Sequence, residues 1–591
     1  MSLSLSTKPA SRSRANGTNS RQVPVANSPL TVLKFGGSIL TNEATLRLAV
    51  HEIYRWRRQG HRVLAVVSAM AGVTDELLEQ CQRMTSRPSP AAVAALVSTG
   101  EAQSAALLGL HLDRAGVPAA VMTPGSIGLE AEGPTLDASP SAVRETPLRA
   151  MLDRAGVVVM PGYIAQHADG RPCLLGRGGS DLTALFLAHR LRADRCRLVK
   201  DVDGLYERDP AGPGPRPQRF AAATWNDALA TDGSIVQHKA VRFAATHEIE
   251  FELGRINGVE PTRIGRGPAA LQGIVAPPRP LRVALLGCGT VGGGVYELLG
   301  QLAPFVEIVR VAVRSLDEPG CQGVSTSLRT TDPIAAARQG ADIVIEVMGG
   351  ADVAHRAVKA ALASGAHVVT ANKALLAEHG PALRSLARAH GRRLRSSAAV
   401  GGSMPLLERF EMQPDRRVRA IRAILNGTTN FVLDRVAGGI ALADAVREAQ
   451  SLGLAEADPT RDLSGRDAAD KLSVLADAVG PTRLPPEQVD AEPLTQDALD
   501  AVLRTRTNGE VFRHVASIDL RGGQPAGEVR LRRLSADDPL ACVTAENNGA
   551  EIHWADGQRE FLHGKGAGRW PTAEAVVADV LEIVRATESG E

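Results

Sequence analysis

The chain has 591 residues, a net charge of +2 and 22% charged residues. This near-neutral balance excludes a strong field that would attract nucleic acid or an anionic membrane surface, and we expect neither partner. No uninterrupted apolar run reaches the roughly 18–20 residues that span a bilayer. The length predicts three to four domains. Six scattered cysteines without a CxxC pair predict no disulfide framework and a reducing, cytoplasmic location.

The first half begins with a polar segment, residues 1–29, and then alternates short apolar runs with amphipathic stretches. Residues 1–29 are rich in Ser, Arg and Asn and contain no acid, so we expect a disordered tail rather than a transit peptide of similar composition. Strand-like runs then include TVLKF, HRVLAVVS, VVVMPGY and CRLVKDV, and SDLTALFLAHRLRA is typical of a helix. The alternation over 30–265 predicts α/β layers around a largely parallel sheet.

The second half repeats this alternation and then changes character. A Pro-rich segment over 266–280 predicts a linker, and a new strand–helix series opens with LRVALLG at 281. We expect a Rossmann domain over 281–400 and a mixed α+β domain over 401–572. A final amphipathic helix over 573–591 is expected to complete the Rossmann domain.

Two segments near the start of the first half combine a strand with a turn of small residues. Lys34 and the turn Gly36-Gly37-Ser38 follow the first strand, where bare backbone amides can approach phosphate and a lysine supplies a mobile charge. The second segment is VVSAMAGVTDEL at 66–77. Each of these turns alone is also typical of a purely structural connection.

Two later segments add charged groups to such turns. In LLGRGGSDLTA at 174–184, Arg177 and Asp181 bracket a glycine turn at a helix N-terminus, an arrangement that favours an anionic substrate. The segment KDVDGLYERDP at 200–210 places acids just after a strand end. A helix cap and a surface arginine are the structural alternatives for the first of these.

In this order and spacing, the four segments resemble the aspartate kinases over about 31–265. The resemblance implies an amino-acid-kinase α/β sandwich that phosphorylates the β-carboxylate of L-aspartate with ATP and Mg²⁺, with Lys34 as a catalytic group. Implied ATP contacts are Lys34, Gly36, Gly37, Ser38, Asp201, Asp203, Gly204 and Tyr206. Implied aspartate contacts are Thr74, Glu101, Arg177, Ser180 and Asp181. Two departures lie at the nucleotide end, since Lys200 stands where the family usually has Thr and no Arg follows the Asp-Pro pair.

The second half opens with a G-x-G-x-x-G turn between a strand and a helix. Its glycines, Gly287, Gly289 and Gly292, permit a tight turn and the close approach of a pyrophosphate. The next strand ends in Val313-Arg314, with no acid at its tip. An acid there would bind a ribose 2′-hydroxyl, whereas Arg314 would accept a 2′-phosphate, so we expect NADPH rather than NADH.

Acids and a lysine crowd the stretch AQSLGLAEADPTRDLSGRDAADKLSVLA at 449–476. Asp467 and Lys471 are four residues apart and lie on one helix face, which is also typical of a surface salt bridge. Only eight of the 67 basic residues are lysines. A lysine inside such a motif is therefore a stronger functional candidate than usual, with a solvated surface residue as the alternative, and a catalytic role would fit a need for proton exchange, which arginine does not readily provide.

Together with EVMGG, TANKALLAEHG, ILNGTTNFVL and GKGAGRWPTAEAVVADV, this stretch resembles homoserine dehydrogenase across 281–591. The resemblance implies that Lys471 is the general acid, that Asp467 orients it and that Lys373 lies beside the nicotinamide. Implied NADP contacts are Gly287, Gly289, Thr290, Val291, Gly292, Arg314 and Lys373. Implied substrate contacts are Glu456, Asp462, Lys471, Gly427 and Thr428.

One departure concerns a monovalent-cation site, for Na⁺ or K⁺, that the homoserine dehydrogenase family commonly carries. Ser397 replaces the acid that the family has before its A-x-V-G turn. Only the backbone carbonyls of Val400 and Gly402 remain as expected ligands.

The two resemblances predict a bifunctional enzyme of the aspartate pathway, which leads to threonine, methionine and lysine. The alternative is an active homoserine dehydrogenase with a catalytically inactive, kinase-like structural module. Known fusions of these enzymes carry regulatory domains between the halves, and about fifteen residues here cannot hold one. We therefore expect no feedback by threonine or lysine through such a domain. The resemblance also implies a homodimer or homotetramer.

Overall fold

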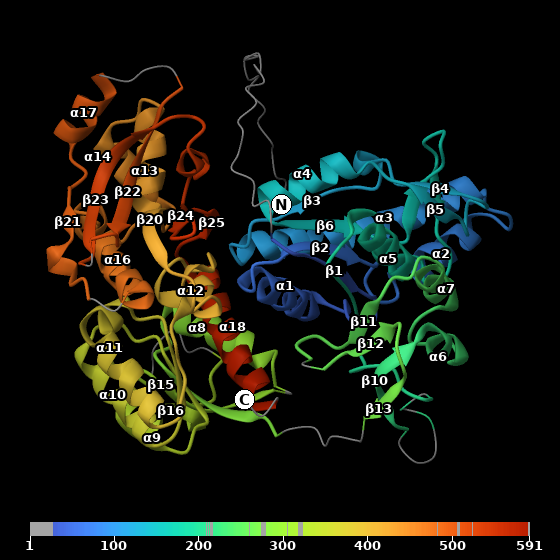
Figure 1. Cartoon of the computed structure of the whole chain (residues 1–591), viewed down its shortest axis with the longest axis horizontal. Coiled ribbons are helices and arrows are strands. Elements are labelled where there is room, and N and C mark those ends of the chain that lie inside the picture. Colours follow the sequence, from blue (N-terminus) through green and yellow to red (C-terminus); the bar gives the residue numbers. More distant parts are fainter. Residues whose placement is uncertain are drawn as a thin grey trace.

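The computed structural model describes residues 28–588 apart from 209, 211, 213–216, 259, 273–278, 304, 317–322, 481–482, 505–508 and 523. Most of the predicted tail at 1–29 lies outside the described residues. Figure 1 shows the first half of the chain as one α/β unit and the second half as two further units. Helices α1 (Glu43–Arg58) and α18 (Arg569–Glu588) lie where the halves meet.

The first unit is built on a nine-stranded sheet in the order β13-β10-β12-β11-β9-β1-β2-β6-β3. Its strands from β11 to β3 in that order pair in parallel, which confirms the largely parallel sheet. The central strands are continuous apolar runs because helices cover both faces. The strands are β1 (Leu30–Phe35), β2 (Arg62–Val67), β3 (Ala120–Val121), β6 (Val157–Pro161), β9 (Arg195–Val199), β10 (Arg219–Thr224), β11 (Phe251–Gly254), β12 (Thr262–Gly265) and β13 (Ala270–Gln272).

Helices and a small second sheet complete the first unit. The second sheet has the order β5-β4-β7-β8. Its strands are β4 (Glu130–Glu132), β5 (Ser139–Ala142), β7 (Ile164–Gln166) and β8 (Pro172–Leu174). Besides α1, the helices are α2 (Val73–Met84), α3 (Pro90–Arg114), α4 (Glu145–Ala155), α5 (Gly179–Leu191), α6 (Trp225–Ala230) and α7 (His238–Thr246).

The last strand of the first unit lies inside the segment expected to be a linker. Strand β13 pairs antiparallel with β10, so the sheet continues to Gln272. The prediction that the linker begins at 266 was therefore wrong. The Gly-Pro pair before this strand suggested a linker, whereas the pairing partner that makes the segment a strand lies about 50 residues earlier, beyond the reach of local pattern.

Helix α3 is apolar enough, by length and composition only, to cross a membrane. An 18-residue window of α3 has a mean hydropathy of 1.3. Polar residues such as Glu101 divide α3, so it contains no uninterrupted apolar run of that length. One side of α3 is buried, with Leu108 and Leu112 packed in one cluster with residues of α1 and β6, as in the core helix of a layered α/β unit.

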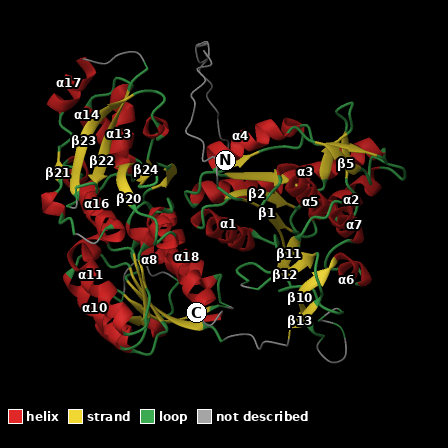
Figure 2. Cartoon of the chain, viewed as in Figure 1, coloured by secondary structure: helices red, strands yellow, loops and turns green. Residues whose placement is uncertain are grey.

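The second unit has six parallel strands in the order β16-β15-β14-β17-β18-β19. This is the doubly wound order of a Rossmann domain, as predicted. Figure 2 shows helices on both sides of these strands. The strands are β14 (Leu281–Leu286), β15 (Val306–Ala312), β16 (Arg329–Thr330), β17 (Ile343–Glu346), β18 (His367–Thr370) and β19 (Leu394–Arg395). The helices are α8 (Thr290–Gly300), α9 (Pro333–Arg338), α10 (Asp352–Ala363) and α11 (Lys373–Ala389).

Helix α18 returns from the end of the described chain to pack on the Rossmann unit. Its buried residues Val576, Val577 and Val580 belong to the same apolar cluster as Val283 of β14 and Val295 of α8. It begins at Arg569, four residues before the predicted start at 573. The final helix thus contributes to the core of the Rossmann unit.

The third unit is the expected α+β domain. Its sheet has the order β21-β23-β22-β20-β24-β25 and is antiparallel except for β21. The strands are β20 (Val418–Ile424), β21 (Asp490–Ala491), β22 (Val511–Asp519), β23 (Ala526–Leu534), β24 (Asn547–Trp554) and β25 (Arg559–Lys565). The helices are α12 (Leu406–Met412), α13 (Gly427–Ala437), α14 (Leu442–Ser451), α15 (Thr460–Leu463), α16 (Arg466–Val479) and α17 (Gln496–Arg504).

The turn between β14 and α8 leaves no room for a side chain at Gly292. A Cβ there would lie 2.1 Å from the carbonyl oxygen of Gly287. Gly292→Ala should therefore destabilise the Rossmann unit by about 1–3 kcal/mol, measured by thermal or urea unfolding. Gly300→Ala, at the other end of α8, meets no atom within 4 Å and is the matched control. Equal stability of the two variants would contradict this reading of the turn.

Candidate active sites

The three glycines of the Rossmann turn have separate structural roles. Gly287 has φ +99° and faces the backbone of Val347, where a Cβ would lie 2.8 Å from the carbonyl oxygen. Gly292 packs against Gly287, whereas Gly289 precedes α8 and faces open space. Gly287 and Gly292 therefore maintain the shape of the turn. The backbone at Gly289, at the N-terminus of α8, stays accessible to a pyrophosphate.

The other predicted cofactor residues lie around this turn. Thr290 and Val291 form the first turn of α8. Arg314 is exposed two residues after β15, the strand beside β14. The carboxyl ends of β14 and its other neighbour, β17, flank the topological switch point, where doubly wound sheets bind their ligands.

Lys373 is held at the start of α11 by residues that the sequence patterns did not single out. Asn372 caps the helix by accepting a hydrogen bond from the Leu375 amide at 3.1 Å, and its Nδ2 donates to the carbonyl of Gly350 at 2.6 Å. Glu346, at the end of β17, accepts a 2.6 Å bond from Thr370 Oγ1 and also contacts Asn372. Burial raises the pKa of Glu346, although these hydrogen bonds oppose the shift.

Asp467 of α16 lies between two lysines that come from different units. Its Oδ2 accepts a 2.7 Å hydrogen bond from Lys471 Nζ, and its Oδ1 is ion-paired with Lys373 Nζ. Lys471 Nζ also donates to the carbonyl oxygen of Leu425 at 2.6 Å. Burial acts to raise the pKa of Asp467, but the two ammonium groups outweigh it and hold the pKa well below its ordinary range. The Asp467 carboxylate therefore joins the Rossmann unit to the α+β unit.

Asn426 extends this cluster and was not predicted from the sequence. Its Nδ2 lies 2.7 Å from Asp462 Oδ1 and 2.9 Å from Asp467 Oδ2, while its Oδ1 caps α13. Burial and the nearby Asp467 charge raise the pKa of Asp462, against the hydrogen bond from Asn426. The segment ILNGTTNFVL stands out in the sequence, but only the fold brings this asparagine beside α16.

The remaining predicted substrate residues of the second half differ in their positions. Gly427 and Thr428 open α13 beside Asn426, and Thr428 Oγ1 donates to the carbonyl of Leu454 at 2.7 Å. The Glu456 side chain is exposed and makes no hydrogen bond or ion pair with the described residues. The structure therefore brings Asp462, Gly427 and Thr428 to the lysine cluster but leaves Glu456 at the surface.

Val400 and Gly402, the residues expected to bind a monovalent cation, lie in a closely packed turn. Val400 is buried, and a Cβ at Gly402 would lie 2.5 Å from the carbonyl oxygen of Lys565. The Ser397 side chain donates to Asp579 Oδ1 at 2.8 Å instead of facing that turn. Arg58 of the first unit donates to the Ser397 hydroxyl at 3.0 Å, so a fixed positive charge already lies beside Ser397. Ser397 and Asp579 are thus engaged with Arg58, and cation binding by Val400 and Gly402 stays a prediction.

In the first unit, Asp181 again lies between two lysines. Lys34 at the end of β1 approaches Asp181 Oδ1 to 2.7 Å, and Lys200 after β9 approaches Oδ2 to 2.9 Å. The two lysines meet because β1 and β9 are parallel neighbours. Burial acts to raise the pKa of Asp181, but Lys200 and Lys34 lower it to about 2. Burial lowers the pKa of Lys34 to about 8, with Asp181 opposing the shift. The site keeps excess positive charge for an anion.

The glycine turn and Glu101 lie close to this cluster. A Cβ at Gly36 would lie 3.1 Å from Lys34 Nζ, and one at Gly37 would lie 3.0 Å from the carbonyl oxygen of Ala69. Glu101 on α3 is 2% exposed, and burial raises its pKa to about 8. The turn therefore brings backbone and ammonium group together, as phosphate binding requires.

Other predicted kinase-site residues lie at the starts of helices or at exposed turns. Ser180 is buried in the first turn of α5, and Thr74 is half-buried in the first turn of α2. Arg177 and Ser38 are exposed. The structure thus brings Ser180 to the same helix turn as Asp181.

The predicted nucleotide end follows β9. Tyr206 Oη donates to Asp203 Oδ1 at 2.7 Å, and Asp201 is exposed. Gly204 is buried, and a Cβ there would lie 2.4 Å from Thr262 Oγ1. The acids therefore lie on the surface at a strand end, where a nucleotide can reach them.

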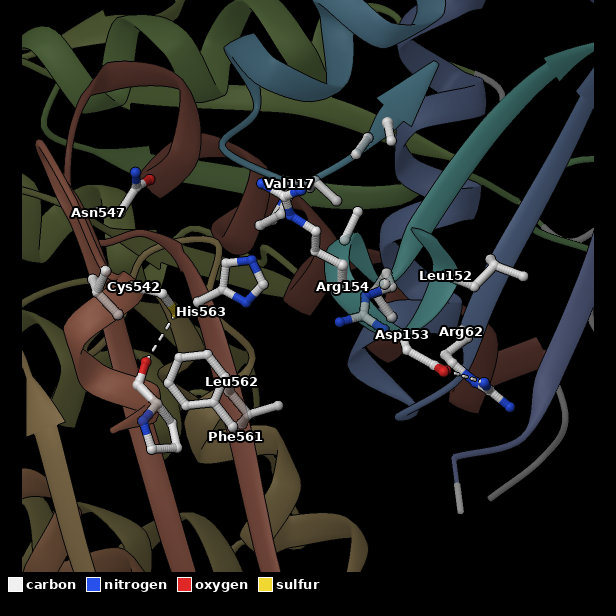
Figure 3. Close-up of a pocket in the computed structure, with 18 of the residues that line it drawn as sticks. Arg62, Val117, Leu152, Asp153, Arg154, Cys542, Asn547, Phe561, Leu562 and His563 are labelled. Carbon is white, nitrogen blue, oxygen red and sulfur yellow. Dashed lines mark hydrogen bonds and ion pairs between the residues drawn. The ribbon is translucent and has the colours of Figure 1, made fainter. Parts of the chain in front are cut away.

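A cavity of about 640 Å³ lies between the two halves, apart from both lysine clusters. Figure 3 shows Arg154 of α4 and His563 of β25 reaching into this cavity from opposite sides. Arg62 and Asp153 on its wall are ion-paired with each other. Burial, with a smaller effect of Arg57, lowers the pKa of His563 to about 4. None of the predicted catalytic residues lines the cavity.

Comparisons with known proteins agree with these units. The amino acid kinase family matches residues 29–251, the NAD-binding domain of homoserine dehydrogenase matches 287–396, and homoserine dehydrogenase matches 405–581. A homoserine dehydrogenase from Synechocystis is 36% identical over 51% of this chain and 73% of its own length. The chain belongs to the homoserine dehydrogenase family.

The first half of this family member is related to a different enzyme. An aspartokinase from Pseudomonas aeruginosa is 29% identical over 46% of this chain and 69% of its own length. A solved homoserine dehydrogenase from Thiobacillus denitrificans is 33% identical, with a TM-score of 0.49 over 52% of this chain and 74% of its own. The family matches and the similarity to aspartokinase show an aspartokinase-type unit fused ahead of a homoserine dehydrogenase, which confirms the predicted bifunctional aspartate-pathway enzyme.

The carboxylate of Asp467 is the single group that holds both dehydrogenase lysines. Asp467→Asn should lower kcat of the dehydrogenase about 100-fold or more, because both ammonium groups lose their common partner. Steady-state kinetics of the purified variant would measure this effect. Asp470→Asn, on the same helix and paired with Arg461, is the control. A kcat within about twofold of wild type for Asp467→Asn would contradict this assignment.

Glu101 gives the kinase unit a pH-dependent stability. The pKa of this carboxyl rises from 4.5 to about 8 on folding, so the folded state binds more protons between these pH values. The free energy of unfolding should therefore fall as pH rises from 4.5 to 8. Glu101→Gln should remove about 1–3 kcal/mol of this decline, measured by denaturant unfolding at pH 5 and pH 8. An identical decline in the variant would show that another group titrates.

Proposed function

We propose that the chain phosphorylates the β-carboxylate of L-aspartate with ATP and reduces L-aspartate 4-semialdehyde to L-homoserine with NADPH. The observation that carries the second reaction is the Lys373–Asp467–Lys471 cluster, which lies between a dinucleotide-binding unit and the α+β unit. The parallel cluster of Lys34, Asp181 and Lys200 supports the first reaction. These products feed the formation of threonine, methionine and lysine.

The dehydrogenase reaction requires a proton donor and a fixed substrate. NADPH, when bound, supplies the hydride. Two of the three N–H groups of Lys471 donate to Asp467 and to the Leu425 carbonyl, which leaves the third for the carbonyl oxygen of the substrate. Lys471 gives its proton to that oxygen as the aldehyde is reduced, and Asp467 keeps the ammonium group in place. Asp462 and the first turn of α13 would bind the amino-acid end of the substrate.

The exposed Arg314 supports NADPH rather than NADH. It follows the second strand of the Rossmann unit, where the adenine ribose is bound in such folds, and the strand tip Val313-Arg314-Ser315 contains no Asp or Glu. A guanidinium there would pair with the 2′-phosphate. The open backbone at Gly289 fits the pyrophosphate.

The kinase reaction depends chiefly on positioning and charge neutralisation. Lys34 and Lys200 would neutralise the transferring phosphoryl group, and the amides of the Gly36–Ser38 turn would bind phosphate oxygens. Glu101, Ser180 and Arg177 would hold aspartate. Mg²⁺ is usually held by one or two carboxylates together with substrate phosphates. Asp201 and Asp203, at the end of β9, fit that role, and the described residues contain no preformed cluster of three metal ligands.

The surroundings and assembly of the enzyme are also proposals. No disulfide joins the five described cysteines to one another, which supports a reducing cytoplasm. We expect a homodimer or homotetramer, with small molecules as the other partners and neither nucleic acid nor membrane. Light scattering of the purified chain would give the assembly state directly.

Two lysine variants separate the two activities. Lys34→Ala should lower ATP-dependent formation of aspartyl hydroxamate about 100-fold or more, with homoserine-dependent reduction of NADP⁺ unchanged. Lys471→Ala should have the reverse effect. Lys359→Ala, an exposed lysine of α10, is the control for both assays. No hydroxamate from the wild type would leave the alternative, an active dehydrogenase with a structural kinase unit.

The choice of nicotinamide cofactor is tested at Arg314. Arg314→Ala should raise KM for NADPH about 10-fold and change KM for NADH little, because only NADPH carries the 2′-phosphate. Arg310→Ala, on the preceding strand, is a suitable control. Equal changes for both cofactors would contradict the proposed contact.

A further inference from the structure

Arg58, the last residue of α1 in the kinase unit, is buried among residues of the dehydrogenase. Its side chain is 1% exposed. Its guanidinium is ion-paired with Asp579, lies 3.1 Å from Glu408 Oε1 and lies 3.3 Å from Glu582 Oε1. It also donates to Ser397 Oγ at 3.0 Å. Each of these four partners belongs to the second half of the chain.

The charges around Arg58 make it a necessary counterion. Asp579 is fully buried and accepts hydrogen bonds from the amide and hydroxyl of Ser397 at 3.0 and 2.8 Å. Glu408 is also buried, and its pKa is raised to about 8 by burial, which Arg58 opposes. Arg395 contacts Glu582 at 3.2 Å but makes no ion pair with Asp579. A buried carboxylate left without its cation is strongly unfavourable.

The partners of Arg58 lie on both sides of a domain connection. Ser397 follows β19, the last strand of the Rossmann unit, and Glu408 lies on α12, the first helix of the α+β unit. Asp579 belongs to α18, which packs on the Rossmann unit. One guanidinium from the kinase unit therefore contacts both ends of the segment 397–408 that joins the two dehydrogenase units.

A second contact holds the same segment from the kinase side. The carbonyl oxygen of Gly116, just after α3, accepts a 2.6 Å hydrogen bond from Ser403 Oγ and a 3.2 Å bond from the Lys565 amide. Gly116 has φ +75°, and a Cβ there would lie 2.6 Å from Ser403 Oγ. The connection is thus fixed to the kinase unit near its middle as well as at its two ends.

Further contacts fix α18 to the kinase unit along its length. His51 Nδ1 of α1 lies 2.8 Å from Glu574 Oε2, and Arg585 is hydrogen-bonded to Asn257. Arg47 of α1 reaches Glu297 of α8 at 2.8 Å. The kinase unit therefore contacts the Rossmann unit and the domain connection as one continuous surface.

These contacts bear on the dehydrogenase reaction because its lysine cluster is divided between the two units that the segment joins. Lys373 belongs to the Rossmann unit, and Asp467 and Lys471 belong to the α+β unit. A small change in the angle between these units would separate Lys373 from Asp467. Misplacement of reacting groups by about 1 Å can cost about 100-fold in rate.

We propose that Arg58 is a positioning residue of the dehydrogenase, through which the kinase unit fixes the angle between the cofactor-binding and substrate-binding units. The dehydrogenase active site is complete only when the kinase unit is docked on segment 397–408. This holds whether or not the kinase unit itself turns over. The proposal rests on the dehydrogenase reaction proposed above.

The test uses the full-length chain with Arg58→Met and Arg58→Lys. Arg58→Met should lower kcat of the dehydrogenase about 10- to 100-fold per folded enzyme, with the Kd for NADPH, measured by fluorescence, within about twofold. Arg58→Lys should recover part of kcat, since it keeps the charge but reaches fewer partners. Arg55→Met is the matched control, because Arg55 lies on the same helix and pairs with Glu52 inside the kinase unit.

A second variant decides the question if Arg58→Met fails to fold. Ser403→Ala removes the 2.6 Å hydrogen bond to Gly116 and a weaker 3.3 Å one to the Lys565 carbonyl, and should lower kcat about threefold, again without a change in NADPH affinity. Unchanged kcat in the folded Arg58 and Ser403 variants would overturn the proposal, as would unchanged kcat in Ser403→Ala when Arg58→Met is insoluble. Absence of homoserine-dependent activity in the wild type would instead refute the proposed reaction, so the two failures are distinguishable.

Discussion

The ion pair between Arg58 and Asp579 is the interaction on which the arrangement of the three units depends. Both side chains are buried, and they come from opposite ends of the chain. Burial of such charges is favourable only when their geometry and hydrogen bonds are complete. The pair therefore adds little to the free energy of folding, and its main effect is to specify a single arrangement of the two halves. The kinase and dehydrogenase units therefore form a single body with two active sites, each at the carboxyl edge of its own parallel sheet.

The two proposed active sites share one electrostatic arrangement. In each, one buried aspartate holds two lysines that arrive from separate elements, Lys34 and Lys200 on Asp181, and Lys373 and Lys471 on Asp467. The carboxylate lets two ammonium groups approach each other and leaves excess positive charge for a phosphate or a carbonyl oxygen. Parallel strands ending side by side bring the first pair together, and contact between two units brings the second.

Local sequence patterns were sufficient to predict the features that depend on residues close together in the chain. The glycine turn at Gly287–Gly292 and the Asp467–Lys471 spacing both follow from the geometry of one helix start or one helix face. Asn426, Glu346 and Arg58 could not be found in this way, because each acts on residues tens to hundreds of positions away. The departures at Ser397 and Lys200 were visible in the sequence, but their partners, Asp579 and Asp181, became apparent only in the folded chain. The role predicted for Glu456 rested on resemblance, and its exposure leaves that role without structural support.

The scarcity of lysine has a consequence for chemical modification. Four of the eight lysines are Lys34, Lys200, Lys373 and Lys471, so half of the lysine amines lie in the two clusters proposed as active sites. A reagent that acylates amines has only four other lysines as targets, Lys8, Lys239, Lys359 and Lys565, on a surface charged mainly by arginine. Lys34, with its pKa lowered to about 8, has an appreciable neutral, nucleophilic fraction in mildly alkaline solution. Mass spectrometry of the peptides would then measure how far each lysine is acylated, and so report substrate binding at both sites in one experiment, because bound substrates shield these amines.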